Sequence, residues 1–241
     1  MKTRILTIAI IVLGLAGAAL AQSVTITPRK VTYRRTKPIM KYKKTFVITY
    51  PRVKAPTPAL SRKIEATIDP VTVLGLNLKD EMNDIQWLEE AGYEVNYNKN
   101  GILSMTLSAN GTAAYPDGFE RYVAVELKTG VRIQPGDAFT DLPGLAAMVR
   151  KTQKAEIAAA LVEIKKEDPE TEDPASLFKD SDFTTKELKE FTIGDNGVTF
   201  IYDYGFPHVI QALQPEGHYF MTWQQLKPFL KTNGPLGRFV R

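Results

Sequence analysis

The sequence contains no cysteine and only two histidines, His208 and His218. The absence of cysteine excludes disulfide bonds and thiol nucleophiles, so a stable fold depends on a buried apolar core. Two histidines leave few groups that transfer protons near neutral pH. The chain also has no G-x-S-x-G turn, which exposes the nucleophile in many hydrolases, and no glycine-rich phosphate loop after a predicted strand. The composition therefore favours recognition over catalysis.

Metal-ligand types and paired carboxylates are also sparse. His208 and His218, with Asp203 and Glu216, form the one local concentration of zinc-ligand types, and their spacing matches no metal motif. The carboxylates of residues 80–90 fall in predicted helices, where a solvated face accounts for them. We therefore predict no catalytic residue, no metal site and no cofactor. An envelope hydrolase that uses His208 or His218 is the alternative.

The N-terminal residues have the pattern of an export signal. Lys2 and Arg4 precede an apolar stretch from Ile5 to Leu20, and the small residues of Ala19-Leu-Ala21 follow in a signal-peptidase pattern. This predicts a signal peptide over residues 1–21 and a secreted or periplasmic mature chain, with an uncleaved anchor as the alternative. No later segment has the apolar length of a membrane span.

Charge is distributed unevenly along the chain. Residues 22–64 contain twelve basic residues and no acidic one, whereas residues 65–241 contain seventeen basic and 27 acidic residues, a net charge of −10. This asymmetry predicts a basic leading segment on an acidic body. The basic segment could contact anionic envelope polymers or lipid headgroups peripherally, or the two parts could neutralise each other within one fold. Nucleic acid is not an expected partner.

The pattern of apolar residues predicts an α+β fold, with antiparallel hairpins and a meander packed against several helices in one or two subdomains. We expect Pro51 to end a strand, Thr57 to cap a helix, and a second helix after Asn77 to end near Gly92. Asn100-Gly101 and Asn196-Gly197 predict hairpin turns. The predicted divisions are a signal peptide (1–21), a basic arm or strands (22–42), an N-terminal α+β part (43–140) and a C-terminal part with a long helix, a hairpin and a final helix (141–241).

One stretch combines aromatic residues with a predicted strand end. In Tyr202-Asp-Tyr-Gly-Phe-Pro-His208 the aromatic residues pass from a strand into a loop, where exposed rings on a rigid support would anchor a protein or sugar partner. We therefore predict Tyr204, Phe206, Pro207 and His208 as partner-binding residues. The alternative is that Tyr202 and Phe206 belong to the core.

An ordered set of short motifs resembles one known family. These motifs are Thr49-Tyr-Pro51, Tyr97 to Ser104, Tyr115-Pro116, Leu127 to Gly130 with Asp137 and Phe139, and Phe191 to Tyr202 with Asn196-Gly197. From about Lys43 to Leu230 the chain resembles the extracytoplasmic module of RsiV-type anti-sigma factors and PdaC-type polysaccharide deacetylases, which is described as domain-of-unknown-function families 4163 and 3298.

The resemblance implies an α+β module in two parts that binds lysozyme in the anti-sigma factors. The chain shows no sigma-binding segment and no deacetylase domain, so signalling and deacetylation are not expected of it. The function expected from the sequence is an exported, soluble binding protein of the cell envelope, with a lysozyme-like protein or peptidoglycan as partner. A structural envelope protein held on anionic surfaces by its basic arm is a further alternative.

Overall fold

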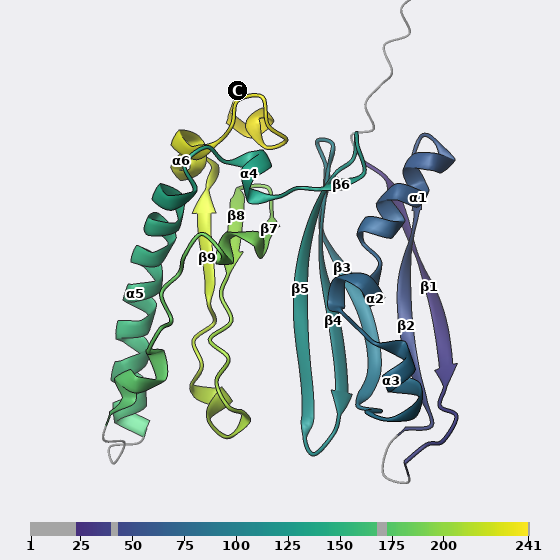
Figure 1. Ribbon diagram of the computed structural model, residues 1–241. Coiled ribbons are helices and arrows are strands. Elements are labelled where there is room, and N and C mark those ends of the chain that lie inside the picture. Colours follow the sequence, from purple (N-terminus) through teal and green to yellow (C-terminus); the bar gives the residue numbers. More distant parts are fainter. Residues whose placement is uncertain (1–22, 40–42, 168–172, 241) are drawn as a thin grey trace, which may run out of the picture.

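Two β-sheets and the helices that pack on them make up the part of the protein that the structure describes. The computed structural model describes residues 23–39, 43–167 and 173–240; the predicted signal peptide and most of the acidic stretch that follows Glu167 lie outside these ranges. Six strands form one sheet in the order β1-β2-β3-β4-β5-β6, and three form a second sheet in the order β7-β8-β9 (Figure 1). The α+β fold class is thereby confirmed. Within the described ranges, no helix combines the length and the apolar character that crossing a membrane requires.

The elements follow one another along the chain without long gaps. The strands are β1 (Thr25–Arg34), β2 (Thr45–Lys54), β3 (Leu88–Lys99), β4 (Ile102–Thr112), β5 (Pro116–Glu126), β6 (Val131–Arg132), β7 (Phe191–Ile193), β8 (Gly197–Ile201) and β9 (His218–Thr222). The α-helices are α1 (Pro58–Thr67), α2 (Pro70–Leu74), α3 (Leu78–Asn83), α4 (Pro135–Ala138), α5 (Leu142–Glu167) and α6 (Trp223–Leu226). Short 3₁₀ turns include η1 (Pro174–Phe178) and η3 (His208–Leu213).

The first core lies between the six-stranded sheet and helices α1 to α3. Neighbouring strands of this sheet are antiparallel except β2 and β3, which run parallel. A parallel pair needs a crossover connection, and α1 to α3 supply it on one face of the sheet (Figure 1). The first core contains the buried residues Phe46, Ile48, Ile64, Ile68, Leu88, Leu103, Met105, Leu107, Val123 and Val125, among others.

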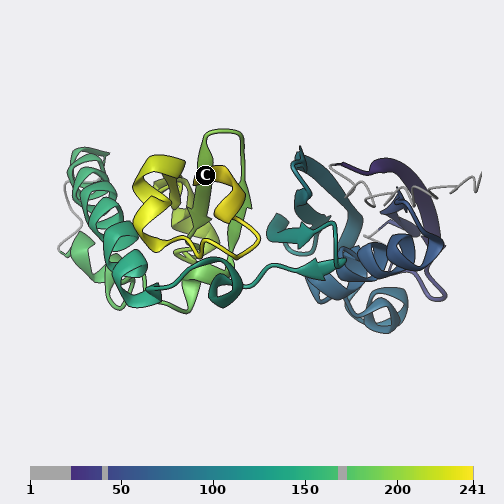
Figure 2. The ribbon, with the colours of Figure 1, turned by 90° about the horizontal axis from the view of Figure 1, so that it is seen from above.

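The second core lies between the three-stranded sheet, α5 and the C-terminal turns. It contains Leu145, Val149, Phe183, Leu188, Phe191, Phe200, Tyr219 and Met221, and it also takes Ile102 and Ala124 from the opposite face of the six-stranded sheet. Side chains alternate along β4, so Leu103 faces the first core while Ile102 faces the second. The two halves lie side by side, and the chain passes from one to the other between β6 and α4 (Figure 2).

Several local signals in the sequence produce the structures that they predict. The Thr57 hydroxyl accepts a hydrogen bond from the N–H of Leu60 at the start of α1, and Thr222 forms a capping box with Gln225 at the start of α6. Asn100 and Gly101 have φ angles of 53° and 71°, as a tight hairpin between β3 and β4 requires. Each of these structures depends on residues that are neighbours in the sequence, so it can be predicted without knowing the tertiary packing.

The helix predicted from Asn77 to about Gly92 is wrong in its second half. Helix α3 ends at Asn83, and strand β3 begins at Leu88. Gln86 has a φ angle of 53°, which no helix accommodates. Its side-chain amide is buried and bonds the backbone of the segment after β1, so a tertiary contact stabilises the break. The apolar spacing alone could not reveal that contact.

The strand that was expected to end at Pro51 continues through it to Lys54. Pro51 lies directly opposite Pro28 of β1. In an antiparallel ladder every second residue pair exchanges no hydrogen bonds, and at such a pair neither proline needs an N–H. The two prolines are compatible with a continuous ladder because they lie opposite each other at a pair that exchanges no hydrogen bonds.

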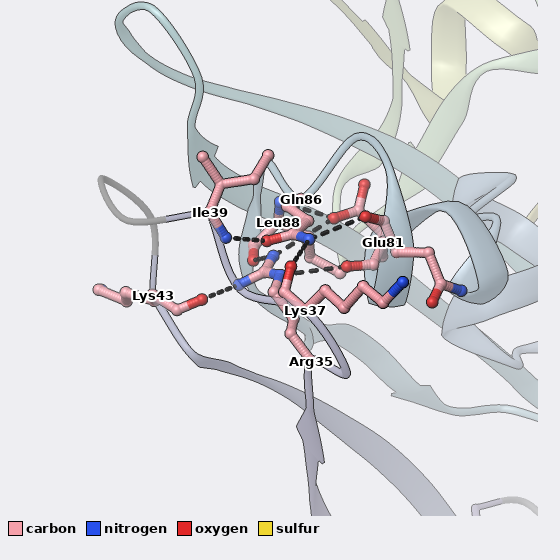
Figure 3. Close-up of polar contacts among 8 residues, drawn as sticks. Arg35, Lys37, Ile39, Lys43, Glu81, Gln86 and Leu88 are labelled. Carbon is pink, nitrogen blue, oxygen red and sulfur yellow. Dashed lines mark hydrogen bonds and ion pairs between the residues drawn. The ribbon is translucent and has the colours of Figure 1, made fainter.

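A buried arginine anchors the segment that follows β1. The Arg35 guanidinium is within 3.4 Å of the Glu81 carboxylate and donates to the backbone carbonyls of Glu81, Lys43 and Leu88, over 3.1, 2.6 and 2.6 Å (Figure 3). The same Glu81 oxygen accepts the N–H of Leu88. Arg35 belongs to the segment predicted as a basic arm or strands (22–42). It is a buried cation that joins α3 and β3 to the β1–β2 connection.

Candidate functional site

The predicted contact residues belong to the β8–β9 loop, residues 202–217, which extends from one end of the three-stranded sheet (Figure 1). The N–H of Tyr202 donates to the carbonyl of Gly217 over 2.8 Å and closes the base of the loop. Gly217 has a φ of 66°, and a Cβ at this position would lie 2.0 Å from the Tyr202 carbonyl oxygen. Only glycine fits here, so the base has a defined backbone geometry.

A carboxylate on α5 bonds both sides of the loop base. One Glu156 oxygen accepts from the hydroxyls of Tyr219 and Tyr204, over 2.7 and 3.1 Å, and these hydroxyls are 2.7 Å apart. The other oxygen accepts the N–H of Gly217 over 3.1 Å. Charge-assisted hydrogen bonds of this kind are stronger than neutral ones. Glu156 therefore joins the chain entering the loop and the chain leaving it to the long helix.

An aromatic contact provides the second attachment of the loop. The Phe206 side chain is 8% exposed, and its ring centroid lies 5.4 Å from that of Phe178 in η1. Tyr204 packs edge-on against the same Phe178 ring at 5.6 Å. The N–H of Phe206 donates to the side-chain oxygen of Gln214 across the loop. Phe206 and Tyr204 thus act as internal supports of the loop.

The apex of the loop is solvent-exposed and apolar. Pro207 is exposed, and the Val209 side chain is 89% exposed, the highest value among the large apolar residues that the structure describes. Residues 208–213 form η3, but the His208 side chain lies outside the described part of the structure. Of the four predicted contact residues, Tyr204 and Phe206 therefore position the loop, and Pro207 is presented to solvent.

The environment of the loop base shifts the pKa values of its tyrosines. Burial, followed by the hydrogen bonds to Tyr204 and Glu156, raises the pKa of the Tyr219 hydroxyl well above its usual range. Burial is also the main cause that raises the pKa of Tyr204. Both hydroxyls therefore stay protonated in the folded protein and remain hydrogen-bond donors to Glu156.

These shifts predict a loss of stability at alkaline pH. In the unfolded chain a tyrosine releases its proton near pH 10, whereas folded Tyr219 keeps it. The stabilisation is complete below pH 10 and decreases as pH rises further, by about 1.4 kcal/mol per pH unit for this residue. Urea unfolding at pH 8 and pH 11 should show a smaller decrease for Tyr219→Phe than for the wild type. Equal decreases in the two proteins would contradict this assignment.

Of the remaining chemistry-bearing residues, His218 is next to the loop base in sequence, between Gly217 and Tyr219. His218 is exposed at the start of β9, and the described residues include no group of three or more histidine, aspartate or glutamate side chains suited to a metal ion. A cavity of about 750 Å³ lies between β6, α4 and residues 231–235. Its charged side chains are engaged within the protein: Lys231 donates to the Gly136 carbonyl, and Asp137 accepts the N–H of Gln134.

The sequence indicates the aromatic residues of the loop but not the residues that hold it. Glu156 is one of several charged residues on α5 and looks in the sequence like part of a solvated face. Tyr219 is followed by two further apolar residues in β9, and nothing in this short run indicates a particular hydrogen-bond partner. No local signal identifies the hydrogen bonds of Glu156, because its partners are 48 to 63 residues away.

Comparison with known proteins relates the fold to solved bacterial structures. No protein-family model matches the sequence, and no curated protein matches it. A crystal structure of a DUF3298 family member from Bacteroides fragilis is 12% identical, with a TM-score of 0.57 over 91% of this chain and 98% of that chain. A DUF3298 family protein from Pseudomonas aeruginosa PAO1 is also 12% identical, with a TM-score of 0.57 over 89% of this chain and 97% of that one.

These similarities establish a shared fold. The part of the sequence resemblance that concerns family 3298 agrees with both structures. The links to RsiV-type anti-sigma factors, to PdaC-type deacetylases and to family 4163 stay predictions.

Proposed function

We propose that this chain is an exported binding protein of the cell envelope that recognises a wall-active enzyme such as lysozyme, or a cell-wall component, through the β8–β9 loop. One observation carries the proposal: the loop base is fixed by Glu156, Tyr204 and Tyr219, while its apex presents Val209 to solvent. A rigid support reduces the conformational entropy that is lost on binding. An exposed apolar residue contributes to the binding free energy when a partner removes it from water.

The charge of the chain supports a basic partner. Residues 65–241 have a net charge of −10, and Asp203 and Glu216 are exposed at the two ends of the loop. Complementary charge steers a basic protein toward this region and raises the association rate. Lysozymes are commonly basic, which makes a lysozyme-like protein the first partner to test, ahead of peptidoglycan.

The test is a titration of the purified chain, beginning at Gln22, with lysozymes and with peptidoglycan fragments. Val209→Asp should weaken binding at least about tenfold, because it places a carboxylate in the apolar contact. The matched control is Val162→Asp on α5, since Val162 is also exposed, at 64%. The proposal would be wrong if no ligand bound, or if both substitutions weakened binding equally.

The hydrolase alternative has its own test. The structure places His218 in β9, while the His208 side chain lies outside the described residues. Substituting both histidines and assaying turnover of wall fragments separates an enzyme from a binding protein. Turnover that is present in the wild type and lost in the variant would favour the enzyme.

A further inference from the structure

Strand β1 forms the outer edge of the six-stranded sheet. It pairs with β2 over ten residues, Thr25 to Arg34, and among the residues that the structure describes the sheet order places no strand on its other side (Figure 1). Most of its side chains are exposed. An edge strand of this length presents backbone N–H and C=O groups that another polypeptide can pair with.

Three observations show which backbone groups point outward. Arg35 donates its N–H to the carbonyl of Lys44, so these two residues form a hydrogen-bonded pair. From there along the ladder, hydrogen-bonded pairs alternate with pairs that exchange no hydrogen bonds. The two prolines, Pro28 and Pro51, then meet at a pair that exchanges no hydrogen bonds, as their missing N–H groups require. Val53 lies opposite Ile26 of β1, and its N–H points away from β1 and donates to the Glu65 side chain. The even-numbered residues of β1 therefore direct their N–H and C=O groups to the open edge.

The open part of this edge runs from Lys30 to Arg34. Pro28 has no N–H to offer. Among the described residues, no hydrogen bond engages the outward N–H groups of Lys30, Thr32 and Arg34. Just before β1, by contrast, the side-chain amide of Asn98 accepts from the N–H of Val24 and donates to its carbonyl, over 3.0 and 2.7 Å. The protein itself thus satisfies the backbone beyond one end of the strand with a peptide-like group.

The charges along the edge select the kind of strand that can pair there. Arg29, Lys30 and Arg34 are exposed, and no acidic residue occurs between residues 22 and 64. Basic side chains on an edge disfavour pairing with a second copy of the same edge, because like charges would lie opposite each other. The same side chains stabilise a strand that carries carboxylates.

We propose that the Lys30–Arg34 edge of β1 binds an extended acidic segment of a partner protein as an additional β-strand. A polypeptide satisfies both the donors and the acceptors of the edge, which an anionic polymer such as polyphosphate cannot do. This surface has the opposite charge to the acidic body, so it is a second binding site, and it does not depend on the function proposed for the β8–β9 loop.

The probe is a fluorescein-labelled peptide of alternating glutamate and valine, titrated by fluorescence polarisation at about 50 mM salt, where screening is weak. Thr32→Pro removes one outward N–H and leaves the β1–β2 ladder intact, in the way that Pro28 does. The matched control is Thr32→Val, which keeps the N–H. A Lys30→Glu/Arg34→Glu variant reverses the charge and keeps every N–H.

We expect Thr32→Pro and the charge-reversed variant each to weaken peptide binding about tenfold or more, and Thr32→Val to change it by less than about twofold. Hydrogen exchange should show that the peptide protects the amides of Lys30, Thr32 and Arg34. Equal binding by Thr32→Pro and Thr32→Val, or by an N-methylated peptide of the same charge, would overturn the proposal in favour of a purely electrostatic surface. No binding at about 1 mM peptide would also overturn it.

Discussion

Replacing Arg35 with methionine is expected to lower the free energy of unfolding by about 3–5 kcal/mol, the usual cost of breaking a buried ion pair from one side. The Arg35 side chain is fully buried and that of Glu81 is 5% exposed. The substitution leaves the Glu81 carboxylate without its cation and leaves three backbone carbonyls without that donor. The free-energy cost of leaving these groups buried without a partner exceeds the stabilisation that burial of the methionine side chain contributes.

Urea unfolding followed through Trp87 measures this effect, because Trp87 packs against the first core. The control is Lys43→Met, which removes the exposed ion pair between Lys43 and Glu89 in the same region. Pairs that are open to solvent contribute about 0–1 kcal/mol. If both variants lost the same small amount of stability, Arg35 would not be the anchor that the structure indicates.

The second large effect is expected at Phe183, where substitution with alanine should cost about 3–5 kcal/mol. Phe183 is fully buried, and its ring lies 6.0 to 6.4 Å from those of Phe200, Tyr202 and Tyr219. Removing the ring creates a cavity beside Tyr219, which also supports the β8–β9 loop. We therefore expect Phe183→Ala to weaken any binding that depends on the loop base.

Trp223 packs against the second core and reports on this half of the protein. Phe220→Ala is the matched control, because Phe220 lies on the opposite face of β9 and is 51% exposed. Its substitution should change stability by no more than about 0.5 kcal/mol. A small effect of Phe183→Ala on the Trp223 transition would show that the cavity collapses or that this ring is not central to the core.

Local features of the fold were predictable wherever neighbouring residues decide them. The hairpin at Asn100-Gly101, the capping residues Thr57 and Thr222, and the long helix near residues 145–166 all follow from local sequence. The helix after Asn77 was predicted too long, because the spacing of Met82, Ile85 and Leu88 imitates a helical stripe. The exposure of Ile85, at 56%, shows that this stripe is not a buried face.

The candidate site could be predicted only in part, for the same reason. The aromatic residues near Pro207 indicated the loop in the sequence. Phe206 is only 8% exposed, which agrees with the alternative that it packs inward. The hydrogen bonds from Glu156 to Tyr204 and Tyr219 involve residues far apart in sequence. No single stretch of the chain carries that information.

The sequence by itself determined the α+β class, the turn and capping positions, the absence of disulfides and the separation of basic and acidic residues, because each depends on composition or on residues close together in the chain. Only the tertiary structure decided that Arg35 is a buried cation, that Glu156 joins both sides of the β8–β9 loop, and that Pro28 and Pro51 share one position in a continuous ladder. The physical reason is that burial and pairing depend on which distant residues meet when the two cores form.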